Sequence, residues 1–293
     1  MRFGLLLFFV NGAAMAWQDY SQVEITTLKL TDNLHMLTGA GGNIGVISGE
    51  DGVFLVDDQF APLTDKIRAA VAAISKESVR FVFNTHWHYD HVGGNENFGK
   101  AGSVIVAHEN VRKRMSTEQF MADFDRKMAP SPKDALPVVT FTRDMSFYLN
   151  GEEIKVVHVP HAHTDGDAVV FFTKANAVHM GDCYFEGFYP YIDVGSGGSI
   201  KGVIAAADLV LARTDAKSQI IPGHGPLSDK ARLQTYREML QGISLAVEKL
   251  IAAGKTREEV IAAKPTAPWD EKAGGGFIKP DTFAGIVFNS LSK

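Results

Sequence analysis

The sequence predicts a domain of the α/β class. Short apolar runs typical of buried strands alternate along the chain with segments in which apolar residues recur every three or four positions, as in helices. The 293 residues include 45% hydrophobic and 22% charged residues, ordinary values for a globular protein that exclude disordered and fibrous classes. No repeat, low-complexity tract or long linker divides the chain, so residues 17–293 are expected to form a single domain.

In the first half of the chain, glycine-rich turns and one helix separate the strand-like runs. Pro62 and Thr64 open that helix, whose apolar positions follow at spacings of three and four. A charged helix is expected near 109–128, followed by a loop that contains several prolines. The strands predicted here lie at 34–37, 44–47, 53–57, 79–83 and 104–107.

In the second half, two helices have clear starting signals. Ser199 is expected to cap a helix that continues through Leu211, because a serine hydroxyl can accept from the first free N–H groups of a helix. A long helix is expected from near Asp229 towards Ile251, and the tail after residue 254 holds another helix and a glycine-rich loop. The predicted strands of this half lie at 154–159, 169–172, 177–180 and 219–221.

Residues 1–16 have the pattern of a secretory signal peptide. Arg2 precedes an apolar run over 3–10, and small residues then lead to the cleavage pattern Ala14-Met15-Ala16. The run is shorter than the roughly 20 residues that span a bilayer. A frayed apolar N-terminus is the alternative. Cleavage would give a periplasmic or secreted protein with no membrane attachment.

Charge and cysteine content limit the classes of partner. The formal net charge is −5, with 29 Lys and Arg against 34 Asp and Glu and no basic run, which argues against nucleic-acid binding. A small-molecule substrate is expected instead. The single cysteine, Cys183, excludes an internal disulfide and a multi-thiolate zinc site.

Histidines and aspartates follow several of the predicted strands. The densest group is an H-x-H-x-D-H motif at 86–91, directly after the 79–83 strand. Ligands gather outside strand ends in α/β sheets, and imidazole and carboxylate groups suit zinc and other divalent transition metals. The sequence therefore predicts a metal site with enough ligands for more than one ion. Later strand ends contribute His161 and His163, Asp182, and the His224 of a Pro-Gly-His-Gly-Pro segment.

Together these residues resemble the metallo-β-lactamase superfamily of metallohydrolases, over essentially the whole mature chain. The resemblance implies a four-layer αβ/βα sandwich with the site at one edge between two sheets. It also implies two metal ions. We expect these to be zinc, and the ligand set also suits iron or manganese. The implied ligands are His86, His88 and His163 for the first ion and Asp90, His91 and His224 for the second, with Asp182 bridging both.

One position departs from the best-known zinc β-lactamases, which place a cysteine where this chain has Asp182 or have no ligand there. Neighbouring strand residues face opposite sides, so Asp182 and Cys183 cannot both face the metals without a bulge. We expect Asp182 to be the ligand and Cys183 to pack in the core. The resulting carboxylate set is shared by thioesterase-like and lactonase-like members of the family.

The resemblance implies a hydrolase that uses a metal-bound hydroxide to open a cyclic amide or another activated acyl bond. β-Lactam hydrolysis is the leading interpretation. The alternatives are a lactonase or thioesterase acting on small acyl metabolites, and a non-hydrolytic metal or redox protein on the same fold. Asp90 and Asp182 are the candidate catalytic residues, with Asp90 expected to orient the nucleophile or to pass a proton to the leaving group.

Substrate contacts are expected in the aromatic segment 184–192, which precedes the glycine-rich stretch 195–198. This pattern suggests an aromatic lip on a flexible hinge, and ordinary packing of a long loop is the alternative. His161 is either a substrate-side residue, a support for a ligand, or an ordinary surface histidine. Trp87 and Tyr89 are expected to face away from the metals. The candidate substrate contacts are His161, Phe185, Tyr189 and Tyr191.

Overall fold

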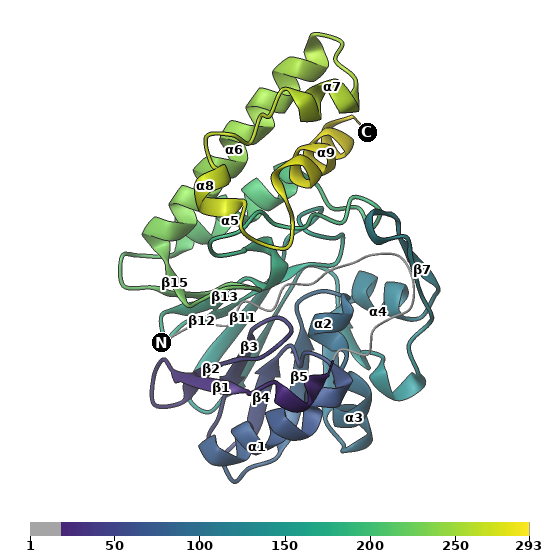
Figure 1. The fold of residues 1–293 in the computed structure, drawn as a ribbon. Coiled ribbons are helices and arrows are strands. Elements are labelled where there is room, and N and C mark those ends of the chain that lie inside the picture. Colours follow the sequence, from purple (N-terminus) through teal and green to yellow (C-terminus); the bar gives the residue numbers. More distant parts are fainter. Residues whose placement is uncertain (1–18, 293) are drawn as a thin grey trace.

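The computed structural model describes residues 19–292, and Figure 1 shows two large sheets enclosed by helices. The signal-peptide prediction concerns residues 1–16 and lies outside the described residues. Among residues 19–292, no helix is both long and apolar enough to cross a bilayer.

The first sheet contains seven strands in the order β1-β2-β3-β4-β5-β6-β9. Its first four strands pair antiparallel, and β4, β5, β6 and β9 pair parallel. The strands are β1 (Thr26–Lys29), β2 (Leu34–Thr38), β3 (Ile44–Ile47), β4 (Val53–Val56), β5 (Val79–Asn84), β6 (Val104–His108) and β9 (Val139–Phe141). The short helices and turns of this half are η1 (Tyr20–Gln22), η2 (Ala61–Leu63), α1 (Thr64–Ile74), α2 (Tyr89–Val92), α3 (Asn95–Lys100), α4 (Glu109–Met115) and η4 (Lys133–Ala135).

The second sheet contains six strands in chain order, β10 to β15. Most pairs are antiparallel, but β13 and β14 run parallel because α5 connects them. The strands are β10 (Asp144–Leu149), β11 (Glu152–His158), β12 (Ala168–Phe172), β13 (Ala177–His179), β14 (Gln219–Ile221) and β15 (Ser228–Asp229). The other elements are η5 (Gly181–Cys183), α5 (Ile200–Arg213), α6 (Lys230–Ala252), α7 (Arg257–Ala262), α8 (Asp270–Ala273) and α9 (Pro280–Leu291).

Alternate residues of the buried strands face different layers. In β4, Phe54 packs between the two sheets, whereas Leu55 packs against α1 and α3 on the outer face. In β12, Val170 faces the first sheet and Val169 faces α5, α6 and α9. Because both faces are covered, these strands have the continuous apolar runs seen in the sequence. The layer order is helix, sheet, sheet, helix, which confirms the predicted sandwich (Figure 1).

The prediction of a helix near 109–128 is confirmed for its first two turns and is wrong after them. α4 ends at Met115, and the chain continues as a hairpin of β7 (Gln119–Met121) and β8 (Arg126–Met128), joined through η3 (Ala122–Phe124). The hydroxyls of Ser116 and Thr117 both donate to the carbonyl of Lys113, at 2.9 and 3.1 Å, and so compete with continued helical bonding.

The two helices with predicted caps begin as expected. The Ser199 hydroxyl accepts the Gly202 N–H at 3.0 Å, and the Asp229 carboxylate accepts the Arg232 N–H at 3.0 Å. The tail after residue 254 holds α7, α8 and α9 rather than one helix, and these helices cover the second sheet together with α5 and α6 (Figure 1).

Candidate metal centre

The predicted ligands lie together, in the loops that follow β5, β11, β13 and β14. β5 belongs to the first sheet and the other three strands to the second, so both sheets contribute ligands to one centre. β5 ends at Asn84, so His86 and His88 occupy a bend rather than a continued strand, and α2 then turns Asp90 and His91 towards the same place. The convergence therefore comes from the loops and not from strand alternation.

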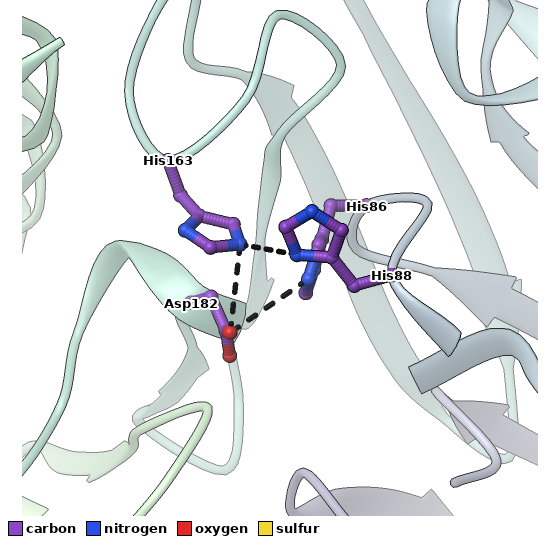
Figure 2. Close-up of side chains that lie close together, drawn as sticks. All are labelled: His86, His88, His163 and Asp182. Atoms are coloured by element: carbon purple, nitrogen blue, oxygen red, sulfur yellow. Dashed lines mark hydrogen bonds and ion pairs between the residues drawn. The ribbon is translucent and has the colours of Figure 1, made fainter. Parts of the chain in front are cut away.

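The first ligand set is formed by His86, His88, His163 and Asp182, whose ligand atoms lie within 4.8 Å of one another. Figure 2 shows the three rings and the carboxylate pointing towards a common point. His163 Nε2 lies 2.8 Å from His88 Nδ1, and Asp182 Oδ2 lies 3.5 Å from His163 Nε2 and 3.7 Å from His86 Nε2. All four side chains are buried.

The second ligand set is formed by Asp90, His91 and His224. His224 Nε2 lies 3.2 Å from Asp90 Oδ2 and 3.3 Å from His91 Nε2. The other carboxylate oxygen of Asp182, Oδ1, lies 3.0 Å from His91 Nε2 and 3.4 Å from His224 Nε2. Asp182 therefore presents one oxygen to each set, which is the arrangement of a bridging ligand.

Hydrogen bonds on the outer side of the rings determine which nitrogens carry protons. His163 Nδ1 donates to the carbonyl of Tyr191 at 2.8 Å, and His88 Nε2 donates to the Asp193 carboxylate at 3.0 Å. With one proton on each ring, the inward nitrogens are then both lone-pair acceptors, only 2.8 Å apart. Two acceptors at this distance repel unless a cation lies between them. The buried Nε2 of His86 also has no hydrogen-bond partner, so the donor set fits a bound divalent metal.

Asp57 holds the second set from behind. Its carboxylate lies 2.8 Å from His91 Nδ1 and also accepts the backbone N–H and the hydroxyl of Thr85. Asp57 is fully buried and has a left-handed backbone with a φ of 64°, a conformation that persists only where surrounding contacts enforce it. Neither Asp57 nor Asp193 was predicted from the sequence. Asp57 did carry a signal, since it follows an apolar strand run as the ligands do.

Histidines of the two sets have opposite pKa shifts. Burial lowers the pKa of His163, in the first set, to about 4, so this ring is uncharged at neutral pH. In the second set, burial opposes the charged form of His224, but Asp182 and Asp90 outweigh it and raise the pKa to about 9. Burial likewise opposes ionisation of Asp90, but His91 and His224 lower its pKa to about 2. Without a cation, protons on the second set balance the aspartates, and metal binding would displace them.

The centre opens to solvent on the side of the second set. Asp90 and His224 are 29% and 26% exposed, whereas the other ligands are almost completely covered. The ring of Phe185 stacks on His224 with centroids 5.0 Å apart, and Tyr191 lies 5.8 Å from His163 and 5.9 Å from His88. Phe185 and Tyr191 therefore border the centre, and their role as substrate contacts stays a prediction.

The other two candidate substrate contacts lie elsewhere. Tyr189 is buried, and its hydroxyl donates to the Thr266 carbonyl and the Asp270 carboxylate while its ring stacks on Phe283. These contacts give Tyr189 a role in packing the C-terminal helices rather than in contacting substrate. His161 is exposed and donates to the carbonyl of Gly197 at 3.0 Å, outside both ligand sets.

The aromatic segment 184–192 is mostly buried, so the packing alternative describes it better than a lip on a hinge. The glycine-rich stretch that follows is a turn closed around Asp193. The Ser196 N–H donates to Asp193 Oδ1 at 2.9 Å, and the Gly198 N–H donates to the Asp193 carbonyl at 2.8 Å. The turn fixes the carboxylate that holds His88.

The side chains expected to face away from the centre do so. Trp87 packs in a separate apolar cluster with Val111 and Met115, and Tyr89 packs against the ring of Phe60 at 5.6 Å. Cys183 is buried in the core between the second sheet and its helices. Burial raises the pKa of its thiol well above the usual value, so a thiolate ligand is not available there.

Comparisons with known proteins agree with this geometry. Residues 37–224, more than half of the chain, match the model of the metallo-beta-lactamase superfamily. A hydroxyacylglutathione hydrolase of Rhodospirillum rubrum is 24% identical over 228 residues, which cover 75% of this chain and 76% of that protein. A beta-lactamase-like protein 2 homolog of Caenorhabditis elegans is 24% identical over 262 residues, which cover 84% and 78%.

Solved structures share the fold at lower identity. A metallo-beta-lactamase from Pontibacter korlensis has a TM-score of 0.60 at 20% identity, over 74% of this chain and 99% of that chain. A double mutant of the sec-alkyl sulfatase PisA1 has a TM-score of 0.70 at 15% identity, over 91% of this chain and 50% of that one. The match over residues 37–224 and the cluster of histidines and aspartates able to hold metal lead to one conclusion: the chain belongs to the metallo-β-lactamase superfamily and is a metallohydrolase.

Proposed function

We propose that this protein is a dinuclear metal-dependent hydrolase that cleaves an activated acyl bond, a thioester or a lactone. The proposal of two metal ions rests on the position of the Asp182 carboxylate, whose Oδ2 lies near His163 and whose Oδ1 lies near His91. One ion in each set could then bind one oxygen of the same carboxylate, as in a bridged two-metal centre. The hydroxyacylglutathione hydrolase among the relatives supports a thioester or a similar bond.

When bound, two divalent cations at this centre polarise a substrate carbonyl and lower the pKa of the attacking water. The chain supplies the remaining functions. Asp90 is the ligand most exposed to solvent, and its lowered pKa keeps it ionised at neutral pH. We infer that its carboxylate orients the attacking water, accepts a proton from it and releases that proton to the leaving group. Tyr191 and Phe185 exclude water from the sides of the centre.

Zinc is our proposal for the metal, because three imidazoles and a carboxylate form a nitrogen-rich first set that suits it. Iron and manganese remain the alternatives, since the second set contains Asp90 and shares Asp182. A periplasmic or secreted location stays a prediction from residues 1–16, and a small-molecule substrate stays a prediction from the charge pattern.

β-Lactam hydrolysis, the leading interpretation from the sequence, has less support. Cys183 is turned into the core, so the cysteine ligand of the best-known zinc β-lactamases has no counterpart here. The likeness to a solved metallo-β-lactamase is at 20% identity and supports the fold only. β-Lactams therefore enter the experiment as a competing substrate class.

A hydrolysis panel tests the proposal. Zinc-loaded protein is assayed against an S-acyl glutathione thioester, an acyl lactone, a cephalosporin and a carbapenem, and its metal content is measured in the same preparation. We expect turnover of the thioester or the lactone, loss of turnover after chelation, and loss of metal and turnover together in a His88→Ala variant. Preferential cleavage of the β-lactams would reject the proposed bond class. No cleavage of any of the four by protein carrying two ions would reject the hydrolase proposal.

A further inference from the structure

We propose that Arg114 is a positioning residue of the first ligand set. Its ion pair with Asp165 fixes the loop that carries His163, and thereby keeps His163 and His88 directed at the same ion. The inference rests on metal binding at this set, which the proposed function requires, and not on which acyl bond is cleaved.

The ion pair joins a helix to the loop of a ligand. Arg114 lies in α4, and Asp165 lies in the loop after β11, two residues after His163. Arg114 Nε is 2.7 Å from Asp165 Oδ1, and Nη2 is 2.7 Å from Oδ2. The two side chains are only 18% and 25% exposed. A partly covered pair with two parallel bonds fixes the direction as well as the distance between two segments, which a single contact between exposed charges does not.

The backbone of Asp165 is anchored on both sides. Its carbonyl accepts from Asn110 Nδ2 at 2.9 Å, which is a second contact from α4. Its N–H donates to the carbonyl of Ser196 at 2.9 Å, in the turn around Asp193. α4 therefore holds Asp165 at two points, and a third bond ties it to the turn that supports His88.

The short segment between Asp165 and His163 is stiff, so the position of one fixes the other. The Thr164 N–H donates to Asp167 Oδ2 at 2.7 Å, and the Thr164 hydroxyl donates to Oδ1 at 2.6 Å. Gly198 packs directly on the backbone of this segment, where a Cβ atom would overlap the His163 carbonyl oxygen. A displacement of Asp165 would therefore move His163 rather than be absorbed within the loop.

The same contacts set the position of His88. The carbonyl of His163 accepts the Asp193 N–H at 2.9 Å, and the Asp193 carboxylate accepts from His88 Nε2 at 3.0 Å. The inward nitrogens of His88 and His163 lie 2.8 Å apart, and a binding constellation must be held within about 0.5 Å. Through Asp165, Arg114 keeps in register the two segments that orient both rings.

The second set is held by other elements. Asp90 and His91 lie in α2, His224 follows β14, and the Asp57 carboxylate supports the His91 ring. Loss of the Arg114 side chain is therefore expected to weaken the ion of the first set more than the ion of the second.

Zinc titration against a chromophoric chelator tests the proposal on the whole chain at neutral pH. Arg114→Met is expected to weaken one of the two ions about tenfold, the lower end of the range for residues that orient metal ligands. Arg114→Lys keeps the charge without the paired geometry, and a smaller loss is expected. Imidazole ¹⁵N spectra recorded as zinc is added identify the weakened ion, which should be the one bound by His88 and His163.

Two further variants serve as controls. Arg237→Met removes a similar pair, in which Arg237 of α6 bonds Asp208 of α5 at 2.8 and 3.2 Å, outside both ligand sets. Asp165→Asn should reproduce Arg114→Met, and the double variant should be no weaker than the weaker single variant, because both changes remove one contact. Additive losses, or an equal loss in Arg237→Met, would overturn the inference.

Urea unfolding of the chelator-treated proteins separates positioning from a structural role. A lower urea midpoint in Arg114→Met with wild-type zinc affinity in the folded protein would overturn the inference. If Arg114→Met does not fold, Arg114→Lys and Asp165→Asn give the same test. These measurements follow metal binding and not turnover. Wild-type zinc affinity in the variants would reject the role of Arg114 and leave the hydrolase proposal standing, whereas failure of the hydrolysis panel would leave the role of Arg114 intact.

Discussion

The hydrogen bond between Asp193 and His88 is the most informative single contact to change. Asp193 Oδ2 accepts from His88 Nε2 at 3.0 Å, and Oδ1 accepts from the Ser196 N–H at 2.9 Å. Burial alone would raise the pKa of Asp193, but the hydrogen bond from His88 outweighs it and leaves the pKa below its usual value. The carboxylate is therefore ionised and holds the proton of His88 on the outer nitrogen.

The substitution Asp193→Asn preserves the shape of the side chain and changes one acceptor into a donor. The amide oxygen can then serve either His88 or Ser196, but not both. With the amide nitrogen facing His88, the ring proton moves to Nδ1, which faces His163 Nε2 at 2.8 Å and is lost as a ligand. Removing such a supporting carboxylate typically weakens metal binding by about 10- to 100-fold, or about 1.4–2.7 kcal/mol. A charge-assisted hydrogen bond is worth a similar amount, about 1.5–3 kcal/mol.

Competition with a chromophoric chelator at neutral pH measures the change in zinc affinity. Asp215→Asn serves as the control, because Asp215 is an exposed carboxylate that bonds the backbone near the start of β14, outside both ligand sets. We expect a loss of about 10- to 100-fold in Asp193→Asn and none in Asp215→Asn. Wild-type zinc affinity in a folded Asp193→Asn protein, as judged by circular dichroism, would refute the argument that Asp193 sets the tautomer of His88.

Three other predictions test separate parts of the structure. Atomic absorption should show the loss of at least one metal equivalent in Asp182→Asn and the wild-type metal content in Cys183→Ser. Metal loss in the Cys183 variant would show that the thiol is a ligand. Chelation should lower the thermal midpoint and added zinc should restore it, because the facing acceptors of His88 and His163 need a cation between them. Free zinc at 100-fold above its Kd should raise the free energy of unfolding by about 2.7 kcal/mol. An unchanged midpoint in calorimetry would argue against a metal at this position. Ser199→Ala should reduce the free energy of unfolding in urea by about 1 kcal/mol through loss of the α5 cap, and a neutral result would show that the cap is dispensable.

Much of the fold could be predicted because both faces of the central strands are buried. Runs such as 53–57 and 169–172 are apolar at every position or nearly so, which makes them visible without any tertiary information. Edge strands lack this signal. β10 alternates exposed and partly buried residues, and sequence reasoning did not find it. The false helical extension after Met115 had apolar residues at helical spacing, but local hydroxyl bonds from Ser116 and Thr117 ended the helix first.

The ligands themselves could be predicted for a similar reason. Each is a polar residue that follows an apolar run, and the H-x-H-x-D-H motif is dense enough to stand out. The residues that orient the ligands are harder to find. Asp193 lies 105 positions from His88, directly after the aromatic segment, and only the folded turn around it brings the two together. Supporting contacts of this kind depend on tertiary structure and leave little trace in spacing.

The central claim is that one carboxylate, that of Asp182, is shared between two metal sites. Anomalous diffraction at the zinc edge, on crystals of zinc-loaded protein, tests it directly. The predicted result is two strong peaks, one within reach of His86, His88 and His163 and one within reach of Asp90, His91 and His224, with an oxygen of Asp182 directed at each. A single peak at full zinc occupancy, or a second peak away from Asp182, would contradict the account.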